Sequence, residues 1–203
     1  EAVELLLEVA AGAEEPELRA AAVESLAWLD GSDEDPARAA APPRALLDLL
    51  ESEADAEVRA ELYSALAFDA GTSWDDARLS RLVERVLTEQ RSEARLQGSR
   101  LIASRLRHHP DARLAEVFDR ELVPWLQAEA SKQGSRYSRL MSVDALKLAD
   151  TRAASEALHD LSRSQDTTVA RAADHALLAQ ARLRSSDRYL SSKLVRGSAD
   201  AEG

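Results

Sequence analysis

One 14-residue pattern, from Asp55 to Phe68, constrains the fold more than any other feature of this sequence. An acidic turn is followed by Val58, Arg59 and apolar residues at helical spacing. Similar segments recur at four further reference positions, which are Arg19, Arg95, Arg139 and Ala170. The intervals between successive reference positions are 31 to 44 residues. Self-similarity with such a period indicates a repeat architecture, in which each unit is one supersecondary element.

Three positions, counted from the reference residue, show how the repeat is built. Position −1 is mostly apolar, position +3 is mostly small, and position +7 is always a large aliphatic residue. The residues at +7 are Leu26, Leu66, Ile102, Leu146 and Leu177. These offsets place the side chains on one face of a helix. We therefore expect position +7 to fill a core and position +3 to let a neighbouring helix approach closely.

These segments resemble the second helix of HEAT repeats, which has the form D-x-x-V-R-x-x-A-x-x-A-L. The best copies are Asp55-Ala56-Glu57-Val58-Arg59 and Asp166-Thr167-Thr168-Val169, whereas Ala94 and Ser138 stand where the form has Val. The resemblance covers about residues 2–185. It implies an all-α fold, a right-handed α-solenoid of about five antiparallel helix pairs whose second helices line a concave surface. HEAT repeats bind many unrelated partners, so the resemblance does not define the function.

Apolar periodicity and helix-breaking residues predict where the helices lie. First helices are expected at about 2–10, 44–51, 77–89, 111–130 and 151–164, and second helices at about 17–29, 57–68, 92–107, 137–149 and 168–185. Loops are expected over the acidic residues 30–43 and over 69–76. Pro124 should kink or split its helix near Leu122–Val123, because proline lacks a backbone N–H.

A continuous repeat favours a single domain, residues 1–185, followed by a basic tail, residues 186–203, that is expected to be flexible. The sequence begins with Glu1 inside a helical pattern, so we expect a piece of a longer protein. No apolar run reaches the roughly 18 residues that a membrane-spanning helix needs, so no membrane span is expected. The absence of cysteine excludes disulfides and leaves the compartment open, with a soluble cytoplasmic protein favoured.

The charge is divided unevenly along the chain. The net charge is −11, and residues 1–89 carry 7 Lys and Arg against 22 Asp and Glu, whereas residues 90–203 carry 19 against 15. The acidic first part and the mildly basic second part could attract different partners, or each other. The overall negative charge argues against nucleic acid as the partner, because nucleic-acid affinity comes from neutralising phosphates.

No motif in the sequence indicates catalysis, a cofactor or a metal. The four histidines, His108, His109, His159 and His175, form no H-x-x-x-H or H-E-x-x-H pair. A G-x-S-x-G motif, a phosphate-binding glycine loop and a dinucleotide-binding fingerprint are also absent from the sequence. We therefore predict a non-catalytic protein-interaction scaffold or regulatory module without a cofactor or metal.

Two alternatives stay open. The first is a nucleic-acid-binding or DNA-repair protein similar to the HEAT-like alkylpurine DNA glycosylases, with Arg95, Arg100, Arg105 and Arg139 on a basic face and Trp125 nearby. The second is a lyase-type chaperone that positions a cofactor on a client protein. The second alternative needs a chromophore-sized pocket, and the sequence has no aromatic cluster to line one.

The reference arginines have a structural role in the HEAT resemblance, where each meets an acidic residue six positions earlier. Glu53 precedes Arg59, and Glu89 precedes Arg95, by this spacing. Arg139 has no such partner and is expected to be freer to bind another molecule. A protein partner is expected on the concave face, and the candidate partner-binding residues are Glu61, Trp74, Arg100, Arg136, Arg139 and Asp174.

Overall fold

The computed structural model describes residues 2–30, 42–68 and 74–199, and within these ranges the chain is all-helical and has no strand. The predicted acidic loop of residues 30–43 and the predicted loop of residues 69–76 lie largely outside the described residues. The all-α fold class is therefore confirmed for the part of the chain that the structure describes.

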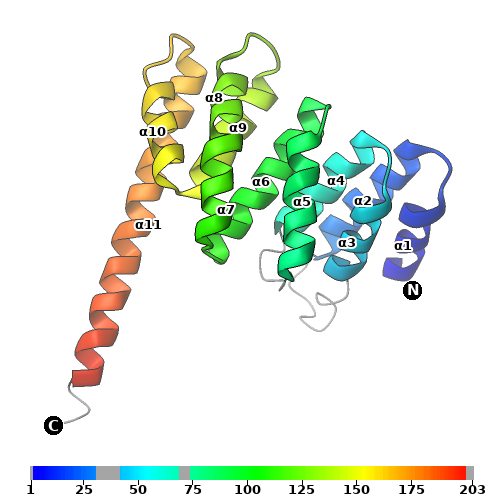
Figure 1. Ribbon diagram of the computed structural model, residues 1–203, viewed down its shortest axis with the longest axis horizontal. Coiled ribbons are helices and arrows are strands. Elements are labelled where there is room, and N and C mark those ends of the chain that lie inside the picture. Colours follow the sequence, from blue (N-terminus) through cyan, green and yellow to red (C-terminus); the bar gives the residue numbers. More distant parts are fainter. Residues whose placement is uncertain (1, 31–41, 69–73, 200–203) are drawn as a thin grey trace.

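The helices follow one another as antiparallel pairs joined by short turns (Figure 1). The first helices are α1 (Ala2–Gly12), α3 (Pro42–Ser52), α5 (Asp76–Thr88), the segment α7 (Ala112–Val117), η1 (Phe118–Leu122) and α8 (Val123–Ser131), and then α10 (Arg152–Leu161). The second helices are α2 (Pro16–Asp30), α4 (Ala56–Phe68), α6 (Ser92–His108), α9 (Arg136–Ala149) and α11 (Thr167–Ala199). Ten predicted helices thus occur close to their predicted positions.

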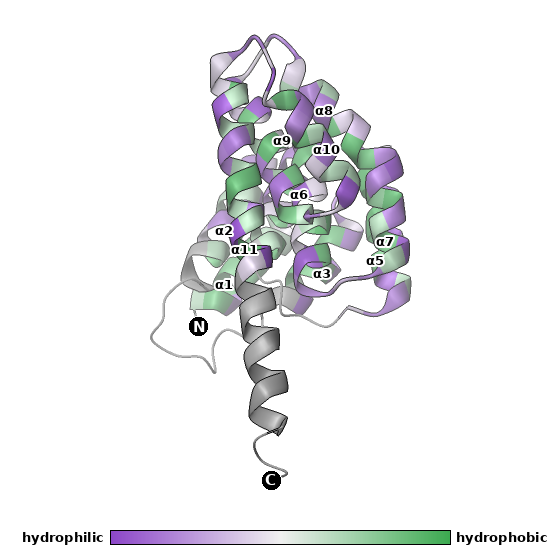
Figure 2. Ribbon diagram, turned by 90° about the vertical axis from the view of Figure 1, so that its left-hand side faces the viewer, coloured by the Kyte–Doolittle hydropathy of each residue, from purple (hydrophilic) through white to green (hydrophobic). Residues whose placement is uncertain are grey.

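The second helices pack side by side in chain order and form one layer: α2 contacts α4, α4 contacts α6, α6 contacts α9, and α9 contacts α11. The first helices form a second layer beside it (Figure 1). Most helices carry both hydrophobic and hydrophilic residues, as Figure 2 shows, because each buries only one side against its neighbours.

The repeat positions identified in the sequence form the core between the two layers. Position −1 is buried at Val58, Ala94 and Val169, and position +7 is buried in the first four pairs. Leu18, which also stands at position −1, is 53% exposed. Position +7 is therefore buried more consistently than position −1.

Gly98 shows why position +3 is small. A Cβ atom at this residue would lie 2.5 Å from Cγ2 of Val86, a fully buried side chain on α5. The glycine therefore allows α6 to approach α5 more closely than any side chain would permit.

The predicted irregularity before Pro124 is confirmed. Residues Phe118–Leu122 form one turn of π-helix between α7 and α8, and Val123 N–H bonds to the carbonyl of Phe118. The widened turn accommodates Pro124, which has no N–H to continue the regular α-helical pattern. Phe118 and Leu122 are both fully buried, so the π-turn also directs two large side chains into the core.

The last helix differs from its prediction. The sequence predicts an end near Ser185, whereas α11 continues to Ala199. No proline or glycine interrupts the sequence between Ser185 and Gly197, so the backbone has no reason to leave the helical conformation there.

Candidate functional site

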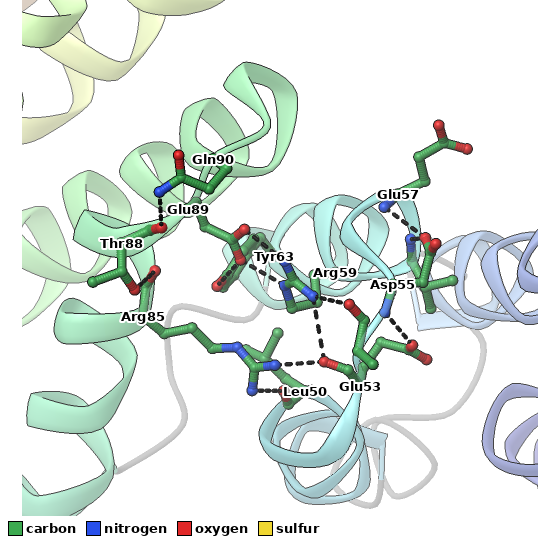
Figure 3. Close-up of polar contacts among 12 residues, drawn as sticks. Leu50, Glu53, Asp55, Glu57, Arg59, Tyr63, Arg85, Thr88, Glu89 and Gln90 are labelled. Atoms are coloured by element: carbon green, nitrogen blue, oxygen red, sulfur yellow. Dashed lines mark hydrogen bonds and ion pairs between the residues drawn. The ribbon is translucent and has the colours of Figure 1, made fainter.

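Arginine side chains join each helix pair to the next, and the clearest example is Arg59 on α4 (Figure 3). Its Nε and Nη2 donate to the two carboxylate oxygens of Glu89, at 2.6 and 2.7 Å. Its Nη1 donates to the backbone carbonyls of Ala54, at 2.5 Å, and of Glu53, at 3.4 Å. Arg59 therefore connects the turn before its own helix to the first residue after α5.

Arg19 repeats this geometry one pair earlier. Its Nε and Nη2 donate to the carboxylate of Glu53 at 2.9 and 3.1 Å. Its Nη1 donates to the carbonyls of Ala13 and Glu14 at 2.9 and 3.1 Å. We call the contact between one helix pair and the next a junction. Two successive junctions thus contain the same bidentate arginine–carboxylate pair, which fixes the orientation of the two side chains as well as their distance.

The arginine and glutamate side chains of these two pairs are largely buried. The hydrogen bonds between them determine the direction in which the pKa values of Glu53 and Arg59 shift. Burial alone would raise the pKa of Glu53, but hydrogen bonds from Arg19 and from the backbone amide of Asp55 lower it below its usual value. The hydrogen bond to Glu89 raises the pKa of Arg59. Burial and the nearby Glu89 carboxylate raise the pKa of Tyr63, whose hydroxyl donates to Glu89 at 3.1 Å.

The arginine pairing expected from the sequence is wrong. Glu53 stands six positions before Arg59, but it accepts a hydrogen bond from Arg59 through its backbone carbonyl. The side-chain carboxylate of Glu53 binds Arg19 instead. The expected pair of Arg95 with Glu89 is also absent, because Glu89 is bound to Arg59. Each carboxylate therefore serves the arginine of the preceding pair, a relation that spacing within one repeat does not indicate.

Two of the arginines proposed for partner binding are already engaged within the chain. Arg139, expected to be free, forms an ion pair with Asp166 at the start of α11. Arg100 lies 3.3 Å from a carboxylate oxygen of Asp144 and also donates to Gln97 at 2.9 Å. The structure thus assigns both side chains to contacts between α6, α9 and α11.

Arg95 is the exception among the reference arginines. No carboxylate lies within ion-pair distance of it in the described part of the chain, and its guanidinium lies over the ring of Trp125 on α8, at 4.8 Å from the ring centre. Its Nε is buried without a hydrogen-bond acceptor. Arg139 was expected to be free and Arg95 to be paired, and the structure reverses both expectations.

Trp74, the proposed aromatic contact with a partner, lies in the core. It is 8% exposed, and Arg105 from α6 lies over its ring at 6.0 Å from the centre. Its position in a predicted loop suggested exposure, but its indole lies against Arg105 of the second helix α6. The side chain therefore has little surface to offer a partner.

Glu61 belongs to an acidic row, formed with Glu24 and Glu93, that was not predicted from the sequence. We call the exposed side of α2, α4, α6, α9 and α11 the second-helix face. Burial, followed by the charges of Glu24 on α2 and Glu93 on α6, raises the pKa of Glu61 on α4. Glu24 and Glu93 are exposed, and Glu61 is half-buried without an ion-pair partner among the described residues. Comparing repeat positions +5, +2 and −2 on successive helices could have revealed this row.

The remaining two candidates, Arg136 and Asp174, are exposed on α9 and α11. Neither has a side-chain partner among the residues that the structure describes, and they lie on different helices. Of the six predicted residues, Glu61, Arg136 and Asp174 are therefore available at the surface, but the structure shows no single cluster that unites them.

A groove with a volume of about 790 Å³ lies where α6 ends and α7 begins, with Ala149, Thr151 and Leu183 on its other side. Its Asp150 carboxylate lies 2.5 Å from Arg184. Within the described ranges, no group of three His, Cys, Asp or Glu could hold a metal ion. No helix in the same ranges is long and apolar enough to cross a membrane.

Comparisons with models of protein families, with curated proteins and with solved structures give no significant match for this chain.

Proposed function

We propose that this chain is a HEAT-like, right-handed α-solenoid of five helix pairs that acts as a non-catalytic protein-interaction scaffold. Its partner binds the second-helix face, which would form the concave surface. The proposal is supported by the consecutive packing of α2, α4, α6, α9 and α11, because this packing repeats the same exposed positions along one continuous surface.

The observation that carries the proposal is the acidic row of Glu24, Glu61 and Glu93. Its three carboxylates come from three successive helices and are close enough to raise the pKa of the central one. Glu61 is half-buried and has no cation partner among the described residues, so its ionised carboxylate costs stability. A partner that brings Lys or Arg side chains would remove this cost, and a basic protein segment is therefore the partner we expect.

The experiment is affinity capture from cell lysate at about 0.15 M salt, a salt concentration at which exposed charges more than about 8 Å apart are screened. Parallel samples with and without nuclease separate a protein partner from nucleic acid. A discrete basic protein that survives nuclease supports the proposal. Nucleic acid that disappears with nuclease and at higher salt refutes it in favour of the repair alternative.

A matched set of variants locates the binding surface. The triple variant Glu24→Gln, Glu61→Gln and Glu93→Gln removes three charges from the second-helix face. The control triple variant replaces three exposed glutamates of the first helices, which are Glu8, Glu84 and Glu116. Both variants change the net charge equally, so loss of capture only in the first identifies the acidic row as the contact surface. Equal loss in both would show attraction by net charge alone.

A further inference from the structure

Arg95 lacks the carboxylate that its equivalents bind. The other reference arginines, Arg19, Arg59 and Arg139, each form an ion pair with an acid from the following helix pair. Arg95 occupies the same position on α6, but it has neither an ion pair nor a side-chain hydrogen bond within the described part of the chain. The junction between the third and fourth pairs therefore has an unneutralised guanidinium.

The local sequence explains the missing acid. Glu89, which binds Arg59, is the first residue after its helix and has extended backbone angles. Lys132 is the corresponding residue after α8, with similar angles, and Gln133 stands six positions before Arg139. The buried carboxylate of Glu129 is bound to Lys132 at 2.5 Å and does not neutralise Arg95. Lys132 corresponds to Glu89 by its place after the helix, Gln133 corresponds to it by repeat spacing, and neither is an anion.

Trp125 holds the guanidinium in a defined orientation. The stacking distance of 4.8 Å is within the range of a favourable cation–π contact. Nε is the nitrogen that is buried without an acceptor, whereas the two terminal nitrogens are not buried in this way. A ligand can therefore approach the Nη1 and Nη2 edge of the guanidinium, which presents two parallel N–H donors to a planar oxyanion.

We propose that Arg95, supported by Trp125, binds a carboxylate of a partner polypeptide at the junction between the third and fourth helix pairs, whereas the neighbouring junctions bind a carboxylate of the chain itself. The carboxylate belongs to an acidic side chain or to a chain terminus. Arg19 and Arg59 show that an arginine at this repeat position holds a carboxylate by two parallel hydrogen bonds, from Nε and Nη2. Arg95 would use Nη1 and Nη2 instead, because its Nε is buried. This site does not depend on the acidic row, so each can be tested without the other.

The test is NMR titration of the ¹⁵N-labelled full chain, observing Nε–H of Arg95 and the indole N–H of Trp125. Three blocked tripeptides separate the sources of the carboxylate at constant ionic strength. Acetyl-Ala-Glu-Ala-amide has a side-chain carboxylate only, acetyl-Ala-Ala-Ala has a terminal carboxylate only, and acetyl-Ala-Gln-Ala-amide has none. Saturable shifts with either carboxylate peptide, and none with the amide control, support the site and identify the source.

Matched variants decide whether Arg95 is responsible. Arg95→Gln should weaken binding by about tenfold or more, because the charge-assisted hydrogen bonds are lost. Arg113→Gln, which removes an exposed charge on α7, should leave the affinity unchanged. The well-dispersed spectrum of each variant verifies its fold, and Arg95→Lys replaces Arg95→Gln if the latter unfolds.

Three results would overturn the proposal. The first is the absence of saturable shifts with both carboxylate peptides. The second is equal binding by the wild-type chain and the Arg95→Gln variant. The third is binding of inorganic phosphate without binding of either carboxylate, which would show that the ligand class is wrong.

Discussion

Replacing Glu89 by Ala should destabilise the protein more than any other single loss of charge at a junction. The Glu89 side chain is 2% exposed, and it accepts hydrogen bonds from Arg59 at 2.6 and 2.7 Å and from Tyr63 at 3.1 Å. The substitution leaves the Arg59 guanidinium, which is 13% exposed, without a counter-charge. Removal of one partner of a buried pair costs about 3–5 kcal/mol.

Chemical denaturation followed by circular dichroism measures this loss, and thermal unfolding should show a melting temperature lower by roughly 6–20 °C. The matched control is Glu156→Ala on α10. Glu156 pairs with Arg152 at 2.8 Å, a similar distance, but the two side chains are 63% and 91% exposed. The control should lose less than about 1 kcal/mol, because water solvates and screens that pair.

A double variant tests whether the loss comes from an unpaired charge. Arg59→Met combined with Glu89→Met removes both charges and keeps most of the apolar volume. This variant should be more stable than Glu89→Ala, since no buried guanidinium is left without a partner. The reasoning is refuted if the two single alanine variants lose similar free energy, or if the double variant is the least stable of all.

Three further predictions follow from other contacts. Gly98→Ala should lower the free energy of unfolding by about 1–3 kcal/mol through overlap with Val86, and Val86→Ala should recover part of the loss in a double variant measured by denaturation. Glu61→Gln should raise the melting temperature at pH 7, because the raised pKa of Glu61 means that its ionised carboxylate opposes folding. The gain should vanish below about pH 4, where Glu61 is protonated in both the folded and the unfolded state. Asp55→Ala should lower the free energy of unfolding by about 1 kcal/mol, because it removes the acceptor of the Glu57 and Val58 amides. These hydrogen bonds lower the pKa of Asp55, so its carboxylate stabilises the fold above about pH 4, and the difference in melting temperature from wild type should shrink at lower pH.

Local features of the fold were predictable because the information is contained in short segments. The apolar positions of each helix, the small residue at position +3 and the break before Pro124 all follow from periodicity and backbone chemistry. The main local error is the end of α11, where a polar composition was interpreted as the end of the helix although no residue forces it to stop.

The candidate site was less predictable, because its contacts cross between helix pairs. Arg139 was expected to be free and is paired with Asp166, whereas Arg95 was expected to be paired and instead stacks on Trp125. Sequence spacing gives the neighbours of an arginine along its own helix. It does not give the turn of the following pair that its guanidinium reaches, since this depends on how the two pairs pack.

The sequence alone determined that this chain folds into helices with one apolar face each, because helical periodicity depends on residues three and four apart. Only the tertiary structure decided which carboxylate meets which arginine, and that Trp74 is buried. It also brought the charges of Glu24 and Glu93, from two other helices, close enough to raise the pKa of Glu61. These outcomes depend on the relative positions of segments about 30 to 40 residues apart, and side-chain charges acquire their partners only when such segments pack together.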